Sequence, residues 1–87
     1  MWERIEETVD RAISGMVYAR FGAVGFETSY DINTKEIHLI VYDKSYKCPN
    51  KNIVIDKKFK YNLENTYEFK AKHDVIGMIE KYFIENY

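Results

Sequence analysis

The amino-acid sequence predicts a small α+β domain, in which an antiparallel sheet of three to four strands is flanked by an N-terminal and a C-terminal helix. Apolar residues recur at three- and four-residue intervals near both ends of the chain, and between these ends they alternate with polar residues. Strands joined by short turns pair antiparallel, and we expect both helices on one face of the sheet. Because 87 residues allow one hydrophobic core, we expect residues 1–87 to form a single domain.

The first helix is expected to begin near Trp2. Its apolar face consists of residues that recur at three- and four-residue intervals, namely Trp2, Ile5, Val9, either Ala12 or Ile13, Met16 and Val17. Gly15 offers an earlier end, which would leave residues 16–21 as a strand. We favour the longer helix, with Arg20 in its last turn and Gly22 as its left-handed cap.

A β-hairpin is expected next. Val24, Phe26, Thr28 and Tyr30 alternate with small or polar residues, which is the period of a strand. Residues 31–35 are rich in turn formers, and Asn33 is well suited to a positive φ. In the second strand one set of residues (Ile37, Leu39, Val41) alternates with another (His38, Ile40, Tyr42). We expect Ile40 and Tyr42 to lie on the face of the sheet that the helices leave open.

The second half of the chain leaves more than one interpretation. Residues 43–51 form the longest loop, and residues 52–56 resume as a strand. Residues 57–70 then form either one long strand or a second hairpin that turns at residues 62–65, with Tyr67 and Phe69 on one face. A final helix is expected to begin with Asp74 as its N-cap and to present an apolar face of Val75, Ile76, Ile79, Tyr82 and Phe83.

The chain carries no set of residues with the spacing of a catalytic or metal site. The side chains best suited to a metal are His38, Cys48, His73 and Asp74, and these lack the paired spacing of zinc ligands. Lysines near Cys48 favour its reactive thiolate, but no histidine is close enough in the sequence to serve as its base. We therefore predict that the protein is not an enzyme and has no metal or cofactor.

The composition predicts a cytoplasmic protein. A single cysteine cannot form a disulfide within the chain, whereas small secreted domains usually carry several. Charged residues occupy the N-terminal positions where a signal peptide needs its apolar segment. No apolar run has the roughly 20 residues that a membrane span requires, so we expect no membrane association.

Charge is distributed unevenly along the chain. Residues 1–43 carry four basic and eight acidic side chains, residues 44–73 carry eight and three, and residues 74–87 carry one and three. The basic middle segment also contains Tyr46, Phe59, Tyr61, Tyr67 and Phe69. We take this segment as the candidate binding surface, with these residues: Tyr42, Lys44, Tyr46, Lys47, Lys51, Lys57, Lys58, Lys60, Tyr61, Tyr67, Lys70 and Lys72.

Two functions fit this segment. Eight tyrosines in a chain of both charges favour a surface that docks onto another protein. Small chains that have many residues with AT-rich codons, no catalytic set and many aromatic side chains are common among mobile-element proteins. By this association we expect a small inhibitor of phage or other mobile-element origin, which evades host defence by occupying a nuclease or another nucleic-acid-handling protein. Alternatively, lysines interleaved with aromatic residues are typical of a module that binds nucleic acid directly. A homodimer, in which a second copy covers an edge strand, also stays open.

Overall fold

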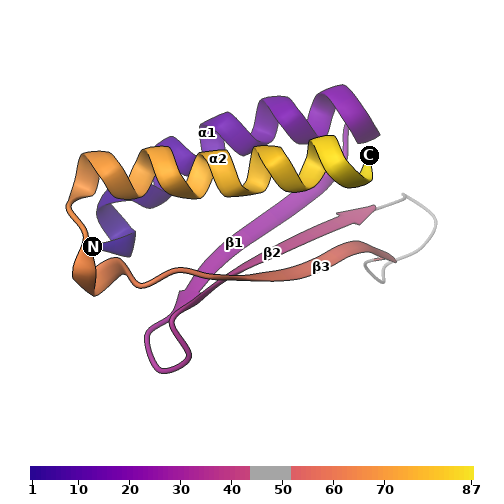
Figure 1. Cartoon of the computed structure of the whole chain (residues 1–87). Coiled ribbons are helices and arrows are strands. Elements are labelled where there is room, and N and C mark those ends of the chain that lie inside the picture. Colours follow the sequence, from indigo (N-terminus) through magenta and orange to yellow (C-terminus); the bar gives the residue numbers. More distant parts are fainter. Residues whose placement is uncertain (44–51) are drawn as a thin grey trace.

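The computed structural model describes residues 1–43 and 52–87 and confirms the predicted α+β class and element order. Its elements are α1 (Trp2–Phe21), β1 (Gly25–Asp31), β2 (Glu36–Asp43), β3 (Asn52–Lys60), the short 3-10 helix η1 (Leu63–Asn65) and α2 (Glu68–Asn86). The two helices lie side by side on one face of the sheet and run in the same direction (Figure 1). The described residues form three strands, so the lower strand number of the prediction is the observed one.

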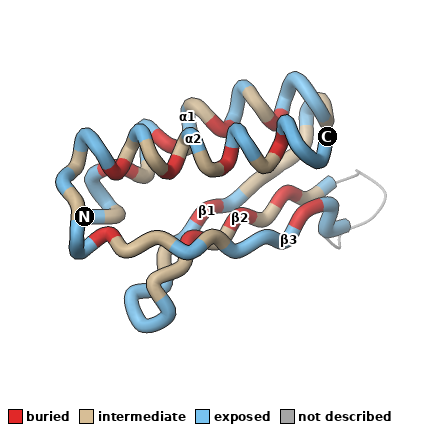
Figure 2. Tube along the Cα trace, in the orientation of Figure 1, coloured by how far each residue is buried: buried red, intermediate tan, exposed pale blue. Residues whose placement is uncertain are grey.

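The core lies between the helix pair and the sheet. The strands are antiparallel in the order β1-β2-β3, which places β2 in the centre. Its residues Ile37, Leu39 and Val41 are fully buried beneath the helices. The helices contribute buried residues at four-residue intervals: Ile5, Val9, Ile13 and Val17 from α1, and Ala71, Val75, Ile79 and Phe83 from α2. Figure 2 shows these buried positions on the sides of the helices and strands that face one another.

Helix α1 continues through Gly15 to Phe21, as the longer of the two predictions had it. Gly15 is exposed, and a Cβ there would meet no other atom, so the glycine lowers helix propensity without opening a gap in the core. The helix ends at Gly22, whose φ of 76° is positive and whose N–H donates to the Tyr18 carbonyl at 2.9 Å. Its ψ of −151° makes this a positive-φ cap outside the predicted left-handed region.

The hairpin turn lies where it was predicted, but the residue with positive φ is Lys35 (54°) and not Asn33. The Asp31 carboxylate accepts the backbone N–H groups of Asn33 and Thr34, at 2.8 and 3.3 Å. The N–H of Lys35 donates to the Asp31 carbonyl at 2.8 Å. These bonds hold residues 32–34 around the Asp31 side chain, and the positive φ occurs at Lys35, the last residue of the turn.

Both interpretations of residues 57–70 were wrong. Strand β3 ends at Lys60, and Asn62 then caps η1 by accepting the N–H of Glu64 at 3.0 Å. Helix α2 begins at Glu68, six residues before the predicted start. The apolar face of α2 extends back to Ala71, which lies four residues before Val75. This spacing continues the helical period and favours a helix from Glu68 onward.

Asp74 is therefore an interior residue of α2 and not its N-cap. Its carboxylate accepts hydrogen bonds from the Tyr61 hydroxyl at 2.6 Å and from the Lys70 ammonium at 2.5 Å. Tyr67 occupies the N-cap position, without a side-chain hydrogen bond to the helix, and both Tyr67 and Phe69 are exposed. Tyr67 and Phe69 are two positions apart, as residues on one face of a strand are, but neither side chain is buried.

Candidate functional site

The side of the sheet opposite the helices is uncovered in the described part of the chain. Paired residues of neighbouring antiparallel strands point to the same face, so the strand register defines this surface. It consists of four rows across β1, β2 and β3: Gly25–Tyr42–Ile53, Glu27–Ile40–Asp56, Ser29–His38–Lys58 and Asp31–Glu36–Lys60. We call these four rows the open sheet face. The predicted placement of Ile40 and Tyr42 on it is confirmed.

One end of the open sheet face is apolar. The Tyr42 ring covers Gly25 so closely that a Cβ at Gly25 would lie 2.4 Å from a ring carbon. Opposite Tyr42 on β3, Ile53 is 50% exposed. The register shifts here, since Val41 pairs with Ile55 and Tyr42 with Ile53, which leaves Val54 as the extra residue of a β-bulge. This end therefore offers aromatic and aliphatic surface at the border of the sheet.

The other end of the open sheet face is polar. His38 Nε2 is hydrogen-bonded to the Asp56 carboxylate, and Ser29 lies opposite His38 on β1. These residue types occur together in hydrolases, but no hydrogen bond joins Ser29 to His38 in the described residues, and such a bond is what activates a serine. A depression of about 410 Å³ adjoins this pair and extends to the hairpin turn, lined by Ser29, Tyr30, Asp31, Ile32, Thr34, Glu36, His38 and Lys58. These side chains make this end of the open sheet face polar.

Sequence reasoning missed the His38–Asp56 pair. The two residues are 18 positions apart, and they meet because β2 and β3 are neighbours. An alignment of the two strands by their alternating patterns would have brought the residues together, although the bulge at Val54 and the length of the preceding loop leave such an alignment ambiguous. The pair could therefore be identified only once the register was known.

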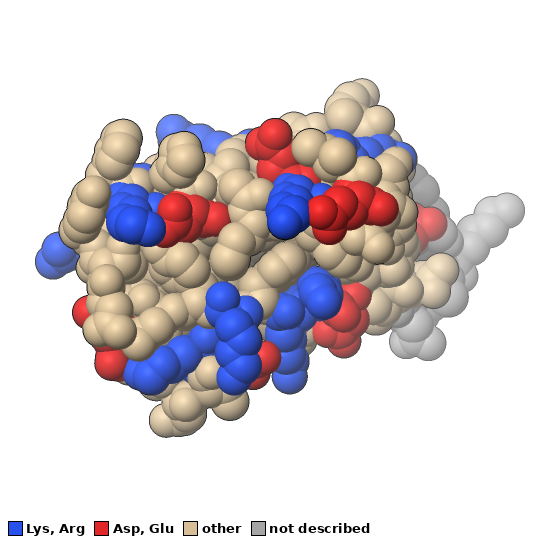
Figure 3. Space-filling model, viewed as in Figure 1, with Lys and Arg blue, Asp and Glu red and all other residues tan. Residues whose placement is uncertain are grey.

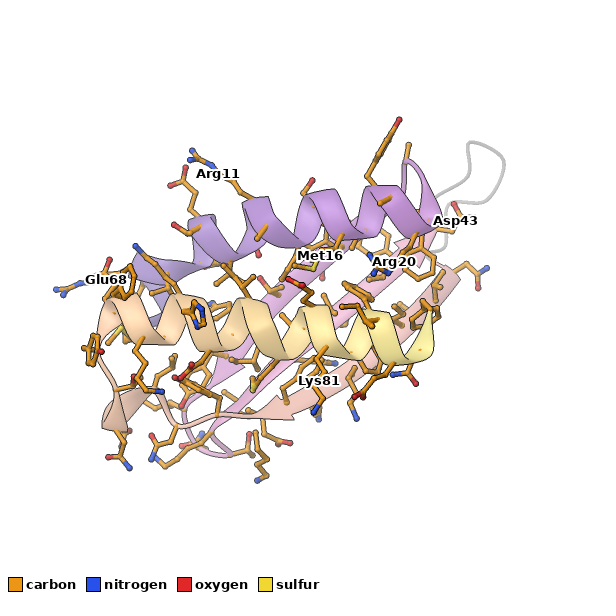
Figure 4. All side chains as sticks on the ribbon, turned by 45° about the horizontal axis from the view of Figure 1, so that its top comes forward. Arg11, Met16, Arg20, Asp43, Glu68 and Lys81 are labelled. Carbon is orange, nitrogen blue, oxygen red and sulfur yellow. The ribbon has the colours of Figure 1, made fainter. Side chains whose placement is uncertain are left out.

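Strand β3 forms one edge of the sheet and carries three exposed lysines, Lys57, Lys58 and Lys60. Figure 3 shows positively charged side chains gathered on this side of the molecule, below α2. A groove of about 410 Å³ separates β3 from α2, lined by Lys57, Phe59, Met78, Lys81, Tyr82, Glu85 and Asn86. In Figure 4 Lys81 points from α2 toward this groove, whereas Arg11 on α1 points away from the sheet. We call β3 together with this groove the β3 edge.

Aromatic rings form the floor of this groove. Phe59 and Tyr82 meet edge to face with ring centroids 5.6 Å apart. The Lys57 ammonium lies 5.7 Å from the Tyr82 centroid and 6.0 Å from that of Phe59, within reach of a cation–π contact. Lys57 is thereby held against the groove, while Lys58 and Lys60 lie on the open sheet face.

The structure divides the predicted basic segment into separate parts. Tyr42, Lys58 and Lys60 lie on the open sheet face, and Lys57 borders the groove. On α2, Lys70 pairs with Asp74 at 2.5 Å, and Lys72 pairs with Glu68 at 3.3 Å. The Tyr61 hydroxyl donates a hydrogen bond to Asp74, and Tyr67 directly precedes α2. Four predicted residues lie outside the described chain, namely Lys44, Tyr46, Lys47 and Lys51. The described cations thus do not form one patch.

The ion pair at the start of α2 keeps its charges tightly bound. The hydrogen bonds from Lys70 and then Tyr61 lower the pKa of Asp74, and the bond to Asp74 raises the pKa of Lys70. Burial, followed by the bond to Asp74, raises the pKa of Tyr61. Because the Lys70 ammonium is engaged by this carboxylate, it offers less positive charge to a phosphate than an unpaired lysine would.

The side of the molecule away from β3 is acidic. A shallow groove of about 470 Å³ between α1 and β1 is lined by Glu3, Glu6, Glu7, Asp10, Arg11, Ser14 and Phe26. Arg11 is bonded to Glu7 at 2.6 Å, as the four-residue spacing favours. The fold therefore converts the uneven charge of the sequence into an acidic side at α1 and a basic side at β3.

No family model matches the chain, and neither a curated protein nor a solved structure is similar to it. Across residues 1–43 and 52–87, no three histidine, cysteine, aspartate or glutamate side chains are grouped so that they could hold a metal ion. Cys48 lies outside this range. Neither α1 nor α2 is both long and apolar enough to cross a membrane.

Proposed function

We propose that this chain is a small binding protein without catalytic activity, and that it docks onto another protein through the open sheet face. One observation carries the proposal: the sheet buries the middle of one face beneath two helices and leaves the other face uncovered in the described residues. A sheet with one solvated face is common in antiparallel folds, where that face is usually polar. Here Ile40, Tyr42 and Ile53 interrupt the polar residues.

The composition of the open sheet face supports protein docking. Aromatic and aliphatic residues surrounded by a polar rim are the usual pattern of a protein interface. Tyr42 is already packed over Gly25, so it would lose little conformational freedom on binding. The flanking charged rows supply hydrogen-bonding groups of both signs, which favour one orientation of the partner over others.

We further propose that the partner handles nucleic acid, and that the chain is a cytoplasmic inhibitor of mobile-element origin that acts on a host defence nuclease. The acidic groove along α1 supports this part of the proposal. Glu7 is paired with Arg11 and Glu3 with the N-terminal ammonium, yet the four carboxylates of this groove, on Glu3, Glu6, Glu7 and Asp10, outnumber these cations. The remaining negative charge is complementary to the basic surface on which a nuclease binds phosphates. Complementary charge also accelerates the encounter of two proteins.

Direct nucleic-acid binding is the competing function, and the ion pairs of Lys70 and Lys72 weigh against it. A mobility-shift assay at low salt, with single- and double-stranded DNA and RNA, separates the two functions. Direct binding would weaken steeply as salt rises, because bound phosphates release counterions. We expect no shift at any salt concentration; a salt-sensitive shift at micromolar protein would favour the competing function.

Site-specific photocrosslinking tests the docking proposal. A benzophenone amino acid is placed at Ser29 on the open sheet face or, as a control, at Tyr18 on α1, which lines neither the open sheet face nor the acidic groove. The variants are irradiated in nuclease-treated host lysate. We expect one protein to be crosslinked in high yield from position 29 and weakly or not at all from position 18. The captured protein is then purified for affinity measurements with variants of this chain.

Affinity for the purified partner decides whether the crosslink reports a specific interface. Tyr42→Ala is expected to weaken binding about tenfold or more, as the loss of a central aromatic does. Tyr18→Ala is the matched control, because Tyr18 is 69% exposed on α1 and remote from the open sheet face. Equal effects of the two substitutions, or equal crosslinking from positions 29 and 18, would contradict docking through this face.

A further inference from the structure

We infer that the β3 edge binds an extended segment of the protein partner by strand addition, and that this segment alternates acidic and apolar residues. The inference rests on the proposed function and specifies which part of the partner is recognised. It follows from three properties of the β3 edge: its backbone has an unpaired side, its two faces differ in chemistry, and its charges disfavour a second copy of the same chain.

The backbone of β3 is available for pairing. In the described chain the nine residues Asn52–Lys60 pair with β2 alone, so the outer side of β3 presents free N–H and C=O groups. An extended peptide can satisfy these groups as a fourth strand, which is a common mode of peptide recognition. The bulge at Val54 disturbs the start of the strand, so the regular template runs over residues 55–60.

Side chains of the added strand that point to the open sheet face would meet Lys58 and Lys60. Both lysines are exposed and occupy neighbouring rows on this face. Directly opposite residues of neighbouring strands lie within about 5.5 Å of one another, and opposite charges there are stabilising. Aspartate or glutamate at the two positions of the partner segment that face Lys58 and Lys60 therefore matches this face.

Side chains of the added strand that point to the other face would enter the groove between β3 and α2. Its floor consists of the rings of Phe59 and Tyr82 beside Met78, which are all partly buried against the core. An apolar side chain placed over these rings would take the place of the Lys57 ammonium, and the exposed lysine side chain can turn toward water. The residues of the partner that alternate with the carboxylates are therefore apolar.

A second copy of β3 fits the β3 edge poorly. In a symmetric antiparallel pair, the residue at the two-fold axis faces its own copy. The register that pairs all nine residues places Asp56 opposite Asp56, and like charges directly opposite one another are destabilising. Moving the axis to Lys57 or Lys58 places that lysine opposite itself and shortens the paired segment, although Asp56 then faces Lys58 or Lys60. Pairing along the whole of β3 therefore favours a heterologous strand over a second copy.

A synthetic peptide tests the inference without the natural partner. The probe is a nine-residue fluorescent peptide of alternating valine and glutamate, matched in length to β3, and its affinity is measured by anisotropy. Three related peptides are compared with it: one with lysine in place of glutamate, and two N-methylated on opposite alternating sets of amides. We expect binding of the glutamate peptide to exceed that of the lysine peptide by about tenfold or more, as several opposite-charge pairs would produce.

The methylated peptides separate strand addition from general charge attraction. Only one alternating set of peptide amides pairs with β3, so methylation of one set should abolish binding and methylation of the other should leave it within about twofold. Equal effects of the two sets would overturn the inference. So would binding that persists after Lys58→Glu with Lys60→Glu but is lost after Arg4→Glu with Arg11→Glu, an identical charge change on α1.

The peptide and crosslinking experiments can fail separately. If position 29 captures a protein partner but the glutamate peptide fails to bind, docking stands and strand addition is wrong. If the peptide binds with the expected methylation pattern but no partner contacts position 29, the β3 edge recognises peptides and the open sheet face is not the interface. Reversible dimerisation through β3, seen by sedimentation and removed by Lys58→Glu, would show that the edge binds a second copy instead.

Discussion

The two faces of β2 differ in burial even where both are apolar. Ile37, Leu39 and Val41 face the helices and are completely buried, whereas Ile40 and Tyr42, also large and largely apolar, remain partly exposed on the open sheet face. The difference arises from what packs against each face. Two amphipathic helices provide one complementary surface, and one surface can cover only one side of a single sheet. The exposed apolar residues of β2 are therefore available for a partner.

Truncation of adjacent β2 residues should give the largest contrast. Leu39→Ala is expected to lower the free energy of unfolding by about 2–5 kcal/mol, because it leaves a cavity beneath both helices. Ile40→Ala removes a similar volume from the open sheet face and should cost about 1 kcal/mol or less. Urea unfolding followed by circular dichroism measures both. Equal losses would mean that the open sheet face is a second core.

The contact between Gly25 and Tyr42 should have an intermediate effect. Gly25→Ala introduces a methyl group that overlaps the Tyr42 ring, so the ring must move, at a cost of about 1 kcal/mol of stability. In a Tyr42→Ala background the same substitution should cost much less. A double-mutant cycle by urea unfolding measures this coupling. Additive effects would show that the ring does not pack over Gly25 in solution.

Stability should depend on pH through the polar network at the start of α2. Lys70 and Tyr61 lower the pKa of Asp74 in the folded protein below its ordinary value of 3.8. A carboxyl whose pKa is lowered on folding stabilises the fold above the unfolded pKa, and this stabilisation is lost as the pH falls through the folded pKa. Asp74→Asn should therefore lower the urea midpoint at pH 7, and the gap from the parent protein should close in acid.

The same network predicts the opposite dependence at high pH. The pKa values of Lys70 and Tyr61 are raised on folding, so their contribution is complete below the unfolded pKa values and disappears as the pH rises through the folded ones. Tyr61→Phe removes the hydroxyl and should weaken this alkaline dependence. If the difference in urea midpoint between the parent protein and the Asp74→Asn variant did not change from neutral to acid pH, Asp74 would not be paired in solution.

Charge reversal on the exposed surface should have the smallest effect on stability. Lys58→Glu on the open sheet face and Arg11→Glu on α1 should each change the free energy of unfolding by about 0.5 kcal/mol or less, since both side chains are exposed. Thermal unfolding measures both. These two substitutions distinguish the open sheet face from α1, because only Lys58→Glu should also impair binding of the glutamate peptide. A large loss of stability for Lys58→Glu would mean that this lysine supports the sheet itself.

The hairpin and its two faces could be predicted from the sequence because their signals are local. Alternation in residues 36–42 assigned Leu39 to the core and Ile40 to the open face, and turn residues fixed where the chain reverses. The start of α2 could not be predicted in the same way. Tyr67 and Phe69 alternate like strand residues, and Asp74 resembles an N-cap unless its partners Tyr61 and Lys70 are known.

The candidate site was predicted less completely, because it depends on register. The sequence shows a continuous basic segment, but in the structure its lysines belong to different elements. Lys58 lies in β3 on the open sheet face, whereas Lys70 lies in α2 and forms an ion pair with Asp74. The His38–Asp56 pair and the groove beside Phe59 require knowledge of which strands and helices are neighbours. Charge composition therefore located the surface roughly and could not show which lysines remain available.

The common direction of α1 and α2 has an electrostatic consequence that no side chain controls. Each helix carries a dipole equivalent to about half a positive charge at its start and half a negative charge at its end. Because α1 and α2, of 20 and 19 residues, lie side by side and begin at the same end of the molecule (Figure 1), these dipoles add. The result is roughly one elementary charge of each sign separated by about 30 Å. Substitution of surface charges would leave this permanent field in place, and the field would help to orient the molecule as it approaches a charged partner.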